Sequence, residues 1–158
     1  MGILRFNRPV INVSDMDKSL AFYRDILGME VVSDNLLVDP ERTKALGQAM
    51  GVPELEIRWV IIESPGGSSR FGVGREVEII QFLKPAWKPV SPHPNAAVVG
   101  VPIAWPAFSC DNLEALYNEL KSKGVKFRGS LMKFATGDRG LCYAIDPDGY
   151  TVELGGTL

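Results

Sequence analysis

Two glutamates and one arginine are the residues of this chain whose types and positions could do chemistry. Glu153 follows an Asp-Pro-Asp-Gly turn at residues 146–149, in a stretch whose alternation puts it opposite the apolar side chains of Val152 and Leu154. Glu78 sits in the same way in an earlier stretch. A desolvated carboxylate in such a position can act as a general base, so both glutamates are candidate catalytic residues.

Arg8 is the third candidate. Two carboxylates that face one cleft repel each other, and a fixed cation between them removes that cost. The guanidinium of Arg8 could pair with Glu78, with Glu153 or with both. In the competing interpretation, Arg8 extends into solvent and the glutamates lie at the rim.

The elements that must position these residues occur twice. A β-rich segment at 10–13 precedes a helical pattern at 16–27 that Gly28 ends, and a segment at 107–110 precedes a second helical pattern that Gly124 ends. Each pattern leads through further strands to one of the two glutamates. The sequence therefore predicts two βαβββ units, residues 4–84 and 101–158, joined by a proline-containing linker at 85–100 within a single domain.

The first unit is longer because of an insertion at 39–51. This segment reads as a helix with Asp39 as N-cap, Pro40 at its first position and Gly51 as its end. It could cover a cleft or merely a sheet edge. The strand expected at 54–62 places Leu55, Ile57, Trp59 and Ile61 on one face.

The predicted fold class is α+β. A single βαβββ unit covers one face of its sheet with its helix and leaves the other face bare. Two units together would form an incomplete barrel with the helices outside and a concave cleft for a ligand. Besides Arg8, Glu78 and Glu153, alternation assigns this inner face the candidate ligand-binding residues Asn12, Trp105, Ser109 and Thr151. Tyr143 is a further candidate, half-buried on its strand with its hydroxyl available to the cleft or to water.

Composition excludes several classes of protein. The net charge of −2 and the pI near 5.5 provide no basic surface for nucleic acid. No apolar run approaches the length that spans a bilayer, and the first residues do not resemble a signal peptide, so we expect a cytoplasmic protein without a membrane partner. Cys110 and Cys142 lack metal-type spacing and are expected to be buried, reduced thiols.

Two stretches resemble a known family. Residues 11–23, followed by Ile-Leu-Gly-Met at 26–29, are similar to the opening of the vicinal oxygen chelate superfamily, which includes glyoxalases, bleomycin resistance proteins and extradiol dioxygenases. Residues 146–154 resemble its closing strand. The resemblance implies this fold for nearly the whole chain, a small-molecule ligand or substrate, and a homodimer, since members often dimerise. One fold hosts many reactions, so the resemblance does not choose between them.

The same resemblance bears on a metal. Metal-dependent members place ligands on the first and last strands of each unit, and Glu78 and Glu153 match the last-strand positions. Arg8 and Trp105 fall on the first-strand positions, and neither side chain can donate a lone pair to a cation. The single histidine, His93, lies in the linker. We therefore expect no metal or other cofactor, although two carboxylates with waters could still hold Mg²⁺ or Mn²⁺.

Three functions remain open at this stage. The favoured one is a lyase or isomerase that transfers a proton on an oxygenated organic substrate, with Glu153 or Glu78 as base and Arg8 stabilising an oxyanion. The second is a non-catalytic protein that holds a planar ligand, in the manner of bleomycin resistance proteins, with Trp105 stacking on it. The third is a metal-dependent, glyoxalase-like or dioxygenase-like enzyme with non-standard ligands.

Overall fold

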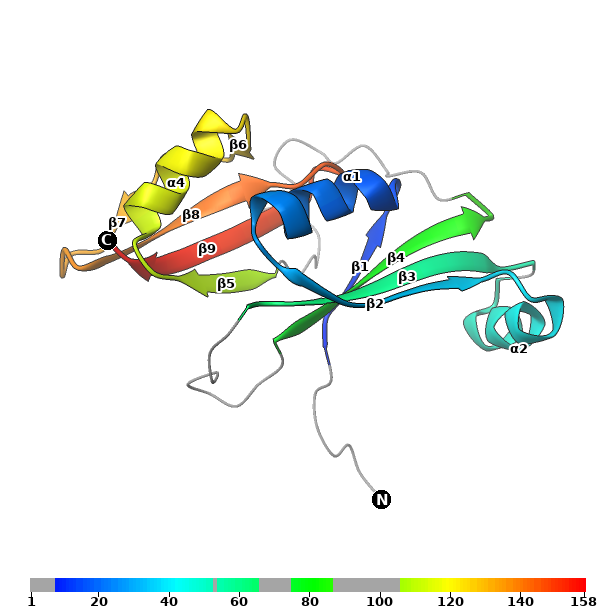
Figure 1. Cartoon of the computed structure of the whole chain (residues 1–158). Coiled ribbons are helices and arrows are strands. Elements are labelled where there is room, and N and C mark those ends of the chain that lie inside the picture. Colours follow the sequence, from blue (N-terminus) through cyan, green and yellow to red (C-terminus); the bar gives the residue numbers. More distant parts are fainter. Residues whose placement is uncertain (1–7, 53, 66–74, 87–105) are drawn as a thin grey trace, which may run out of the picture. The chain divides into compact units, whose positions relative to one another are not determined.

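The computed structural model describes residues 8–52, 54–65, 75–86 and 106–158 (Figure 1). The chain divides into two compact units, which we call the first unit (residues 1–89) and the second unit (residues 90–158). Each unit combines one sheet with few helices, as expected for the α+β class.

The first unit contains four strands in the order β1-β4-β3-β2. Its elements are β1 (Val10–Val13), α1 (Met16–Leu20), η1 (Ala21–Ile26), β2 (Glu30–Leu37), α2 (Pro40–Met50), β3 (Glu56–Glu63) and β4 (Glu76–Lys84). Strands β1 and β4 are parallel neighbours, and the other pairs are antiparallel. Helix α2 interrupts an otherwise plain βαβββ order, as the insertion predicted.

The second unit repeats this arrangement, with the strand order β5-β9-β8-β6 and β7 paired to β8. Its elements are β5 (Ala107–Cys110), α4 (Leu113–Ser122), β6 (Lys126–Phe127), β7 (Met132–Lys133), β8 (Arg139–Ile145) and β9 (Thr151–Thr157). Its first and last strands are again parallel neighbours. The internal repeat is thus visible in the sheet topology, although two short strands, β6 and β7, stand where the first unit has the long strand β2.

The first helical segment differs from a plain α-helix. After α1 the chain continues as a π-helix, η1, in which Leu27 N–H donates to the Phe22 carbonyl at 3.0 Å. The wider turn allows the consecutive residues Phe22 and Tyr23 both to be buried, with their rings in edge contact and centroids 5.0 Å apart. Gly28, with φ of +75°, ends the segment as predicted.

The first sheet is buried on both faces. Val60, Ile62, Val77 and Ile79 form the face on which α1 lies, and all four are at most 4% exposed. The opposite face carries a second apolar cluster, composed of Leu37, Leu55 and Ile57 with the partly buried Leu46, Val52, Trp59, Ile80 and Phe82. The predicted face of β3 therefore exists and packs beside α2. Val60 and Ile62 give the strand a second buried face, which was not predicted, on the side where α1 lies.

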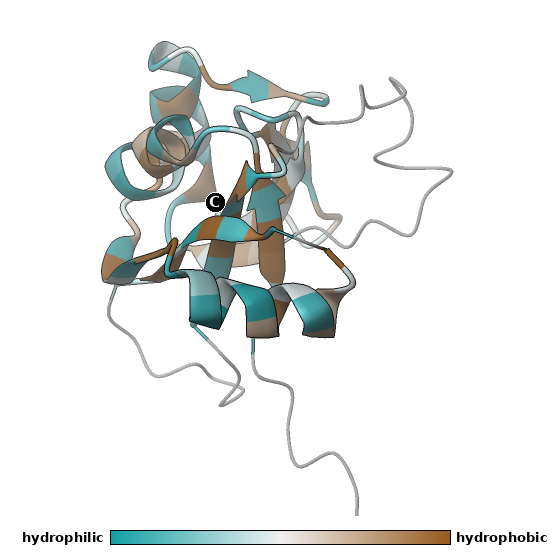
Figure 2. Ribbon diagram, turned by 90° about the vertical axis from the view of Figure 1, so that its right-hand side faces the viewer, coloured by the Kyte–Doolittle hydropathy of each residue, from teal (hydrophilic) through white to brown (hydrophobic). Residues whose placement is uncertain are grey.

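Helix α2 has the predicted ends. The Asp39 carboxylate accepts from Arg42 N–H at 3.0 Å, Pro40 occupies the first turn, and Gly51 takes the left-handed conformation. In Figure 2, α2 is the helix nearest the viewer, and its ribbon is mostly hydrophilic in colour. Only its Thr43 and Gly47 positions are buried, so α2 covers the sheet with a narrow stripe.

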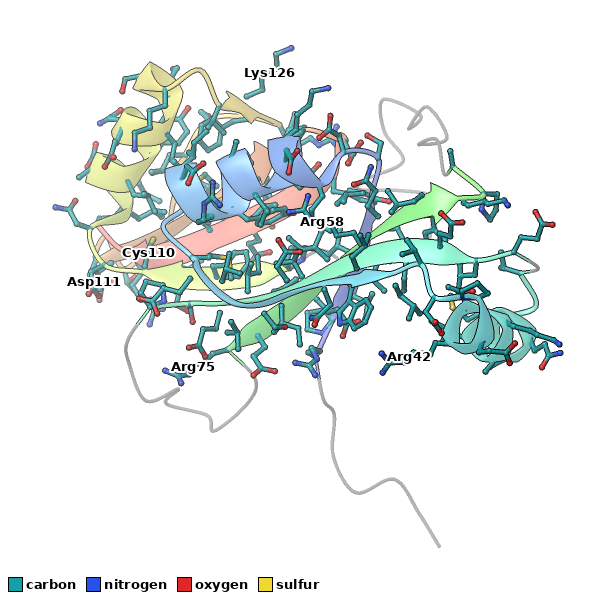
Figure 3. All side chains as sticks on the ribbon, turned by 45° about the vertical axis from the view of Figure 1, so that its right-hand side comes forward. Arg42, Arg58, Arg75, Cys110, Asp111 and Lys126 are labelled. Carbon is teal, nitrogen blue, oxygen red and sulfur yellow. The ribbon has the colours of Figure 1, made fainter. Side chains whose placement is uncertain are left out.

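The second unit buries one face of its sheet under α4. Leu113 and Leu120 of the helix lie against Cys142, Val152 and Leu154, all almost fully buried. Both cysteines are free thiols, as predicted, but only Cys142 is buried; Cys110, on β5, is partly exposed (Figure 3). Burial raises the pKa of the Cys142 thiol to about 11, so this group stays protonated at neutral pH.

None of the described helices is long and apolar enough to cross a membrane.

Gln81 of β4 joins the sheet to α1, and its removal provides a test of this fold. Its side-chain carbonyl accepts from Met16 N–H, and its amide donates to the Ser14 carbonyl, both at 3.1 Å. We expect Gln81→Leu to lower the free energy of unfolding by about 1–3 kcal/mol, because the buried Met16 N–H loses its acceptor. Urea denaturation measures this. The control Gln48→Leu, on the exposed side of α2, should change it by less than about 0.5 kcal/mol; equal losses would contradict the assigned role of Gln81.

Candidate functional site

The first unit carries an ion-pair cluster formed by Arg8, Glu76 and Glu78. Arg8 lies two residues before the start of β1, and both glutamates lie on β4, the parallel neighbour of β1. Arg8 Nη1 donates a hydrogen bond to Glu76 Oε2, and Arg8 Nε lies 3.3 Å from Glu78 Oε2. The three side chains are 20%, 38% and 23% exposed, respectively, so the cluster is half-buried rather than freely solvated.

Strand alternation explains why these three groups meet. Val77 and Ile79 point toward α1, so the intervening positions 76 and 78 project from the opposite face. There the two carboxylates flank one guanidinium, whose fork suits carboxylate oxygens. The contact to Glu78 is an ion pair without hydrogen-bond alignment, since the buried Arg8 Nε–H has no hydrogen-bond acceptor within the described residues.

Glu153 occupies the same position in the second unit that Glu78 occupies in the first. Glu78 stands opposite Val10, and Glu153 stands opposite Ala107, in the two parallel strand pairs. The backbone repeats this equivalence: Glu78 N–H donates to the Pro9 carbonyl and Glu153 N–H to the Pro106 carbonyl, each at 3.0 Å.

The side chain that meets Glu153 is a phenol. Tyr143 of β8 is its cross-strand partner, and the two side chains are hydrogen-bonded. Burial raises the pKa of Tyr143, and the charge of Glu153 and this hydrogen bond raise it further. The phenol therefore stays protonated at neutral pH and donates to the carboxylate. Such a pair can hold a carboxylate in place without neutralising it.

The remaining predicted ligand-binding residues differ in exposure. Asn12 and Ser109 are exposed on the faces that lie away from the helices. Thr151 is only 5% exposed, and its hydroxyl accepts from Arg128 Nε at 3.3 Å. Arg128 Nη2 also donates to the Gly149 carbonyl at 2.8 Å, so this arginine holds the turn that leads into β9. Trp105 and His93 lie outside the described residues.

Sequence reasoning missed two charged groups. Glu76 was not among the predicted site residues, although it accepts the hydrogen bond from Arg8. Arg58 of β3 grips both oxygens of Asp34, at 3.0 and 2.7 Å, and reaches Asp17 of α1 at 2.8 Å (Figure 3). The hydrogen bonds to these two carboxylates raise the pKa of Arg58 above its ordinary value. No periodicity marks such a cross-strand pairing in the sequence.

The Arg8, Glu76 and Glu78 cluster is a poor set of ligands for a divalent metal. Glu78, the residue that matches a metal ligand of the family, has a permanently charged guanidinium 3.3 Å away. A cation placed at that carboxylate would be repelled by Arg8, which can neither lose its proton nor coordinate. Among the described residues, no cluster of three or more His, Cys, Asp or Glu side chains has the geometry of a metal site.

Comparison with known proteins gives a consistent result. The family model for the Glyoxalase/Bleomycin resistance protein/Dioxygenase superfamily matches residues 5–154. A lactoylglutathione lyase from Schizosaccharomyces pombe is 25% identical over 98% of this chain and 48% of its own length. The chain thus spans about half the length of this curated relative.

Solved structures of low identity share the fold. A glyoxalase family protein from Bacillus cereus has a TM-score of 0.79 at 18% identity, covering 100% of this chain and 97% of the other. Glyoxalase I from Zea mays has a TM-score of 0.65 at 20% identity, covering 96% of this chain and 44% of its own.

The pairing of Tyr143 with Glu153 predicts a specific pH dependence. Because the native pKa of Tyr143 is raised, its contribution to stability is complete below the unfolded value of about 10 and is lost as the pH rises through the native value. We expect Glu153→Gln to move the pKa of Tyr143 downward, while burial still keeps it above its usual value. NMR titration of the Tyr143 ring, assigned with Tyr143→Phe, measures this. Glu119→Gln, on α4, should leave that pKa unchanged, and an equal shift in both variants would contradict the pairing.

Proposed function

Because the chain belongs to the Glyoxalase/Bleomycin resistance protein/Dioxygenase superfamily, we propose that it is a small-molecule enzyme of the lyase or isomerase kind. Its reaction is a proton transfer next to a carbonyl group of an oxygenated organic substrate. The observation that carries this proposal is the hydrogen bond from the neutral Tyr143 phenol to the Glu153 carboxylate. The cytoplasmic location and the homodimer expected from the sequence stay predictions.

Glu153 is the better of the two candidate bases. Adding a proton to Glu78 would sacrifice its attraction to the guanidinium 3.3 Å away. Glu153 has a neutral hydrogen-bond donor, the Tyr143 phenol, which orients the carboxylate. Because the phenol carries no charge, no ion pair is lost when Glu153 accepts a proton. In the proposed step the substrate C–H proton moves to a Glu153 oxygen, and the electron pair of the broken bond passes to the carbonyl oxygen, which becomes an enolate.

Arg8 serves as the fixed cation in this proposal. Glu76 and Glu78 hold its guanidinium, so the charge has a fixed position before a substrate binds. A guanidinium held in this way is suited to stabilise an oxygen on which negative charge develops, which is the role that the sequence predicts for Arg8. A permanently protonated donor is suited to this role, because it needs no proton transfer of its own.

Hydrogen–deuterium exchange tests the catalytic proposal. The curated relative is named a lactoylglutathione lyase, so lactoylglutathione, whose lactoyl C–H is next to a carbonyl, is a suitable first substrate. In D₂O we expect the native chain to replace this hydrogen with deuterium, as followed by NMR. Glu153→Gln should slow the exchange by about 10²–10⁴-fold because the general base is lost, while the affinity measured by titration stays nearly unchanged.

The controls separate catalysis from simple binding. Glu119→Gln removes an exposed carboxylate of α4 that pairs with Lys123, and it should exchange at the native rate. Undiminished exchange in Glu153→Gln would overturn the assignment of the base. The native chain could instead bind the compound without exchanging its hydrogen. If Trp105→Ala weakened this binding and Glu153→Gln did not change it, the result would support the ligand-holding function.

The metal-free character of the first unit is a separate prediction. We expect elemental analysis of the chain purified without chelator to find less than one equivalent of a divalent metal, because Arg8 repels a cation at Glu78. Arg8→His replaces this cation with a ligand and should increase metal uptake. One equivalent of metal in the native chain would contradict the role of Arg8 and restore the metal-dependent alternative. Arg8→Lys, which keeps the charge, is the matched control.

A further inference from the structure

Gly155 lies two residues beyond Glu153 on β9 and on the same face of the sheet. Its cross-strand neighbours are Ser109 of β5 and Leu141 of β8, and Met132 of β7 stands beyond Leu141. These four residues form a row across the second sheet, which we call the Gly155 row. It runs beside the row that contains Ala107, Glu153 and Tyr143.

The backbone does not require glycine at position 155. A Cβ atom added there would meet only the Gly140 carbonyl oxygen among the described residues, at an ordinary 3.8 Å. By contrast, a Cβ atom at Gly156 would lie 1.9 Å from the Cys110 oxygen, and one at Gly140 would lie 2.4 Å from the Met132 oxygen. Neither has space for a side chain. Glycine inside a strand costs stability, so its presence at 155, where no described atom of the second unit obstructs a side chain, indicates a different reason.

In the first unit, the position that corresponds to Gly155 carries a large side chain. Ile80 has the place of Gly155, because it pairs with Asn12 of β1 and Trp59 of β3 as Gly155 pairs with Ser109 and Leu141. Ile80 and Trp59 pack against the apolar cluster under α2. In the second unit the corresponding row has Gly155 in place of Ile80 and the smaller Leu141 in place of Trp59.

The surroundings of Gly155 define what could occupy the open space. Leu141 is partly buried and Met132 is 49% exposed, so apolar surface lies to one side. The exposed Ser109 lies to the other side. The Tyr143–Glu153 pair stands in the adjacent row, one side-chain spacing along the strands. A ligand with an apolar group above Gly155 could therefore place its neighbouring atoms next to the Tyr143–Glu153 pair.

We propose that the Gly155 row is an apolar subsite that receives the non-reacting alkyl or aryl substituent of the ligand, with Gly155 setting the size of substituent that fits. The proposal rests on the proposed function in that Glu153 then faces the oxygenated end of the same molecule. The ligand class is an oxygenated compound with a carbonyl or hydroxyl group and an adjacent apolar substituent comparable in size to the missing isoleucine side chain.

Binding of a matched series of ligands tests this subsite. The probes are hydroxymethyl ketones with methyl, butyl or phenyl substituents, titrated into the full chain while the amide signals of residues 109, 141 and 155 are followed by NMR. We expect the affinity of the native chain to rise by up to about fourfold per added methylene group, as for burial of apolar surface. Gly155→Val should reduce the affinity for the butyl and phenyl probes by at least about tenfold and leave the methyl probe unchanged.

Two controls make the substitution interpretable. Gly129→Val introduces the same side chain at an exposed position with no atom within 4 Å of an added Cβ, and it should not change any affinity. Gly155→Val should unfold at the native temperature or higher, because valine favours strands and no described atom obstructs its Cβ. A large loss of stability would show that the glycine is structural and overturn the inference. Leu141→Ala provides a second variant, expected to weaken only the butyl and phenyl probes.

The outcomes distinguish the subsite from the reaction. Substituent-dependent binding that Gly155→Val removes, together with no deuterium exchange on lactoylglutathione, would support the subsite and overturn the proposed reaction. Deuterium exchange together with affinities that do not depend on the substituent would support the reaction and overturn the subsite. Signal changes confined to residues outside the Gly155 row would overturn it as well.

Discussion

The parallel pairing of the first and last strands in each unit is the constraint on which the rest of this structure depends. It begins where the carbonyl of a proline, Pro9 or Pro106, accepts from the N–H of a glutamate, Glu78 or Glu153. Proline lacks an N–H of its own, so only its carbonyl can join the ladder at this point. Once this register is set, alternation directs the neighbours of each glutamate into the core and the carboxylate to the opposite face.

The two units use one backbone frame for different chemistry. In the first unit the last-strand glutamate has a guanidinium beside it; in the second unit its neighbour across the strands is a phenol. The next row is filled by Ile80 and Trp59 in one unit, whereas the other has Gly155 in this row. Both units bury apolar residues on the face that α1 or α4 covers, and they differ on the opposite face, where, among the described residues, only the first unit has an apolar cluster beside α2.

Much of this arrangement could be predicted from the sequence, because it depends on local signals. Alternation placed Glu78 and Glu153 on the correct face, and capping residues gave the ends of α2. The ion pair between Arg8 and Glu78 was predicted, whereas the π-helical turn, the second buried face of β3 and the hydrogen bond from Arg8 to Glu76 were not. Each depends on which side chain stands opposite in a neighbouring element, and a single sequence does not record such pairings. Gly155 was overlooked for the same reason. Its importance follows only from a comparison with Gly156, where a side chain has no space, and with Ile80, which fills the corresponding position in the first unit.

The type of cation in the first unit determines which group must move the proton in the proposed reaction. A metal ion can bind water, ionise it and exchange one ligand for another, so it can supply both an electrophile and a base. A guanidinium held by Glu76 and Glu78 supplies only charge and fixed hydrogen-bond donors. Within the first unit, Glu78 already pairs with this guanidinium, so it is the less suitable base. Within the second unit, Glu153 is hydrogen-bonded to a phenol that stays protonated, which leaves its carboxylate able to accept a proton in the proposed reaction.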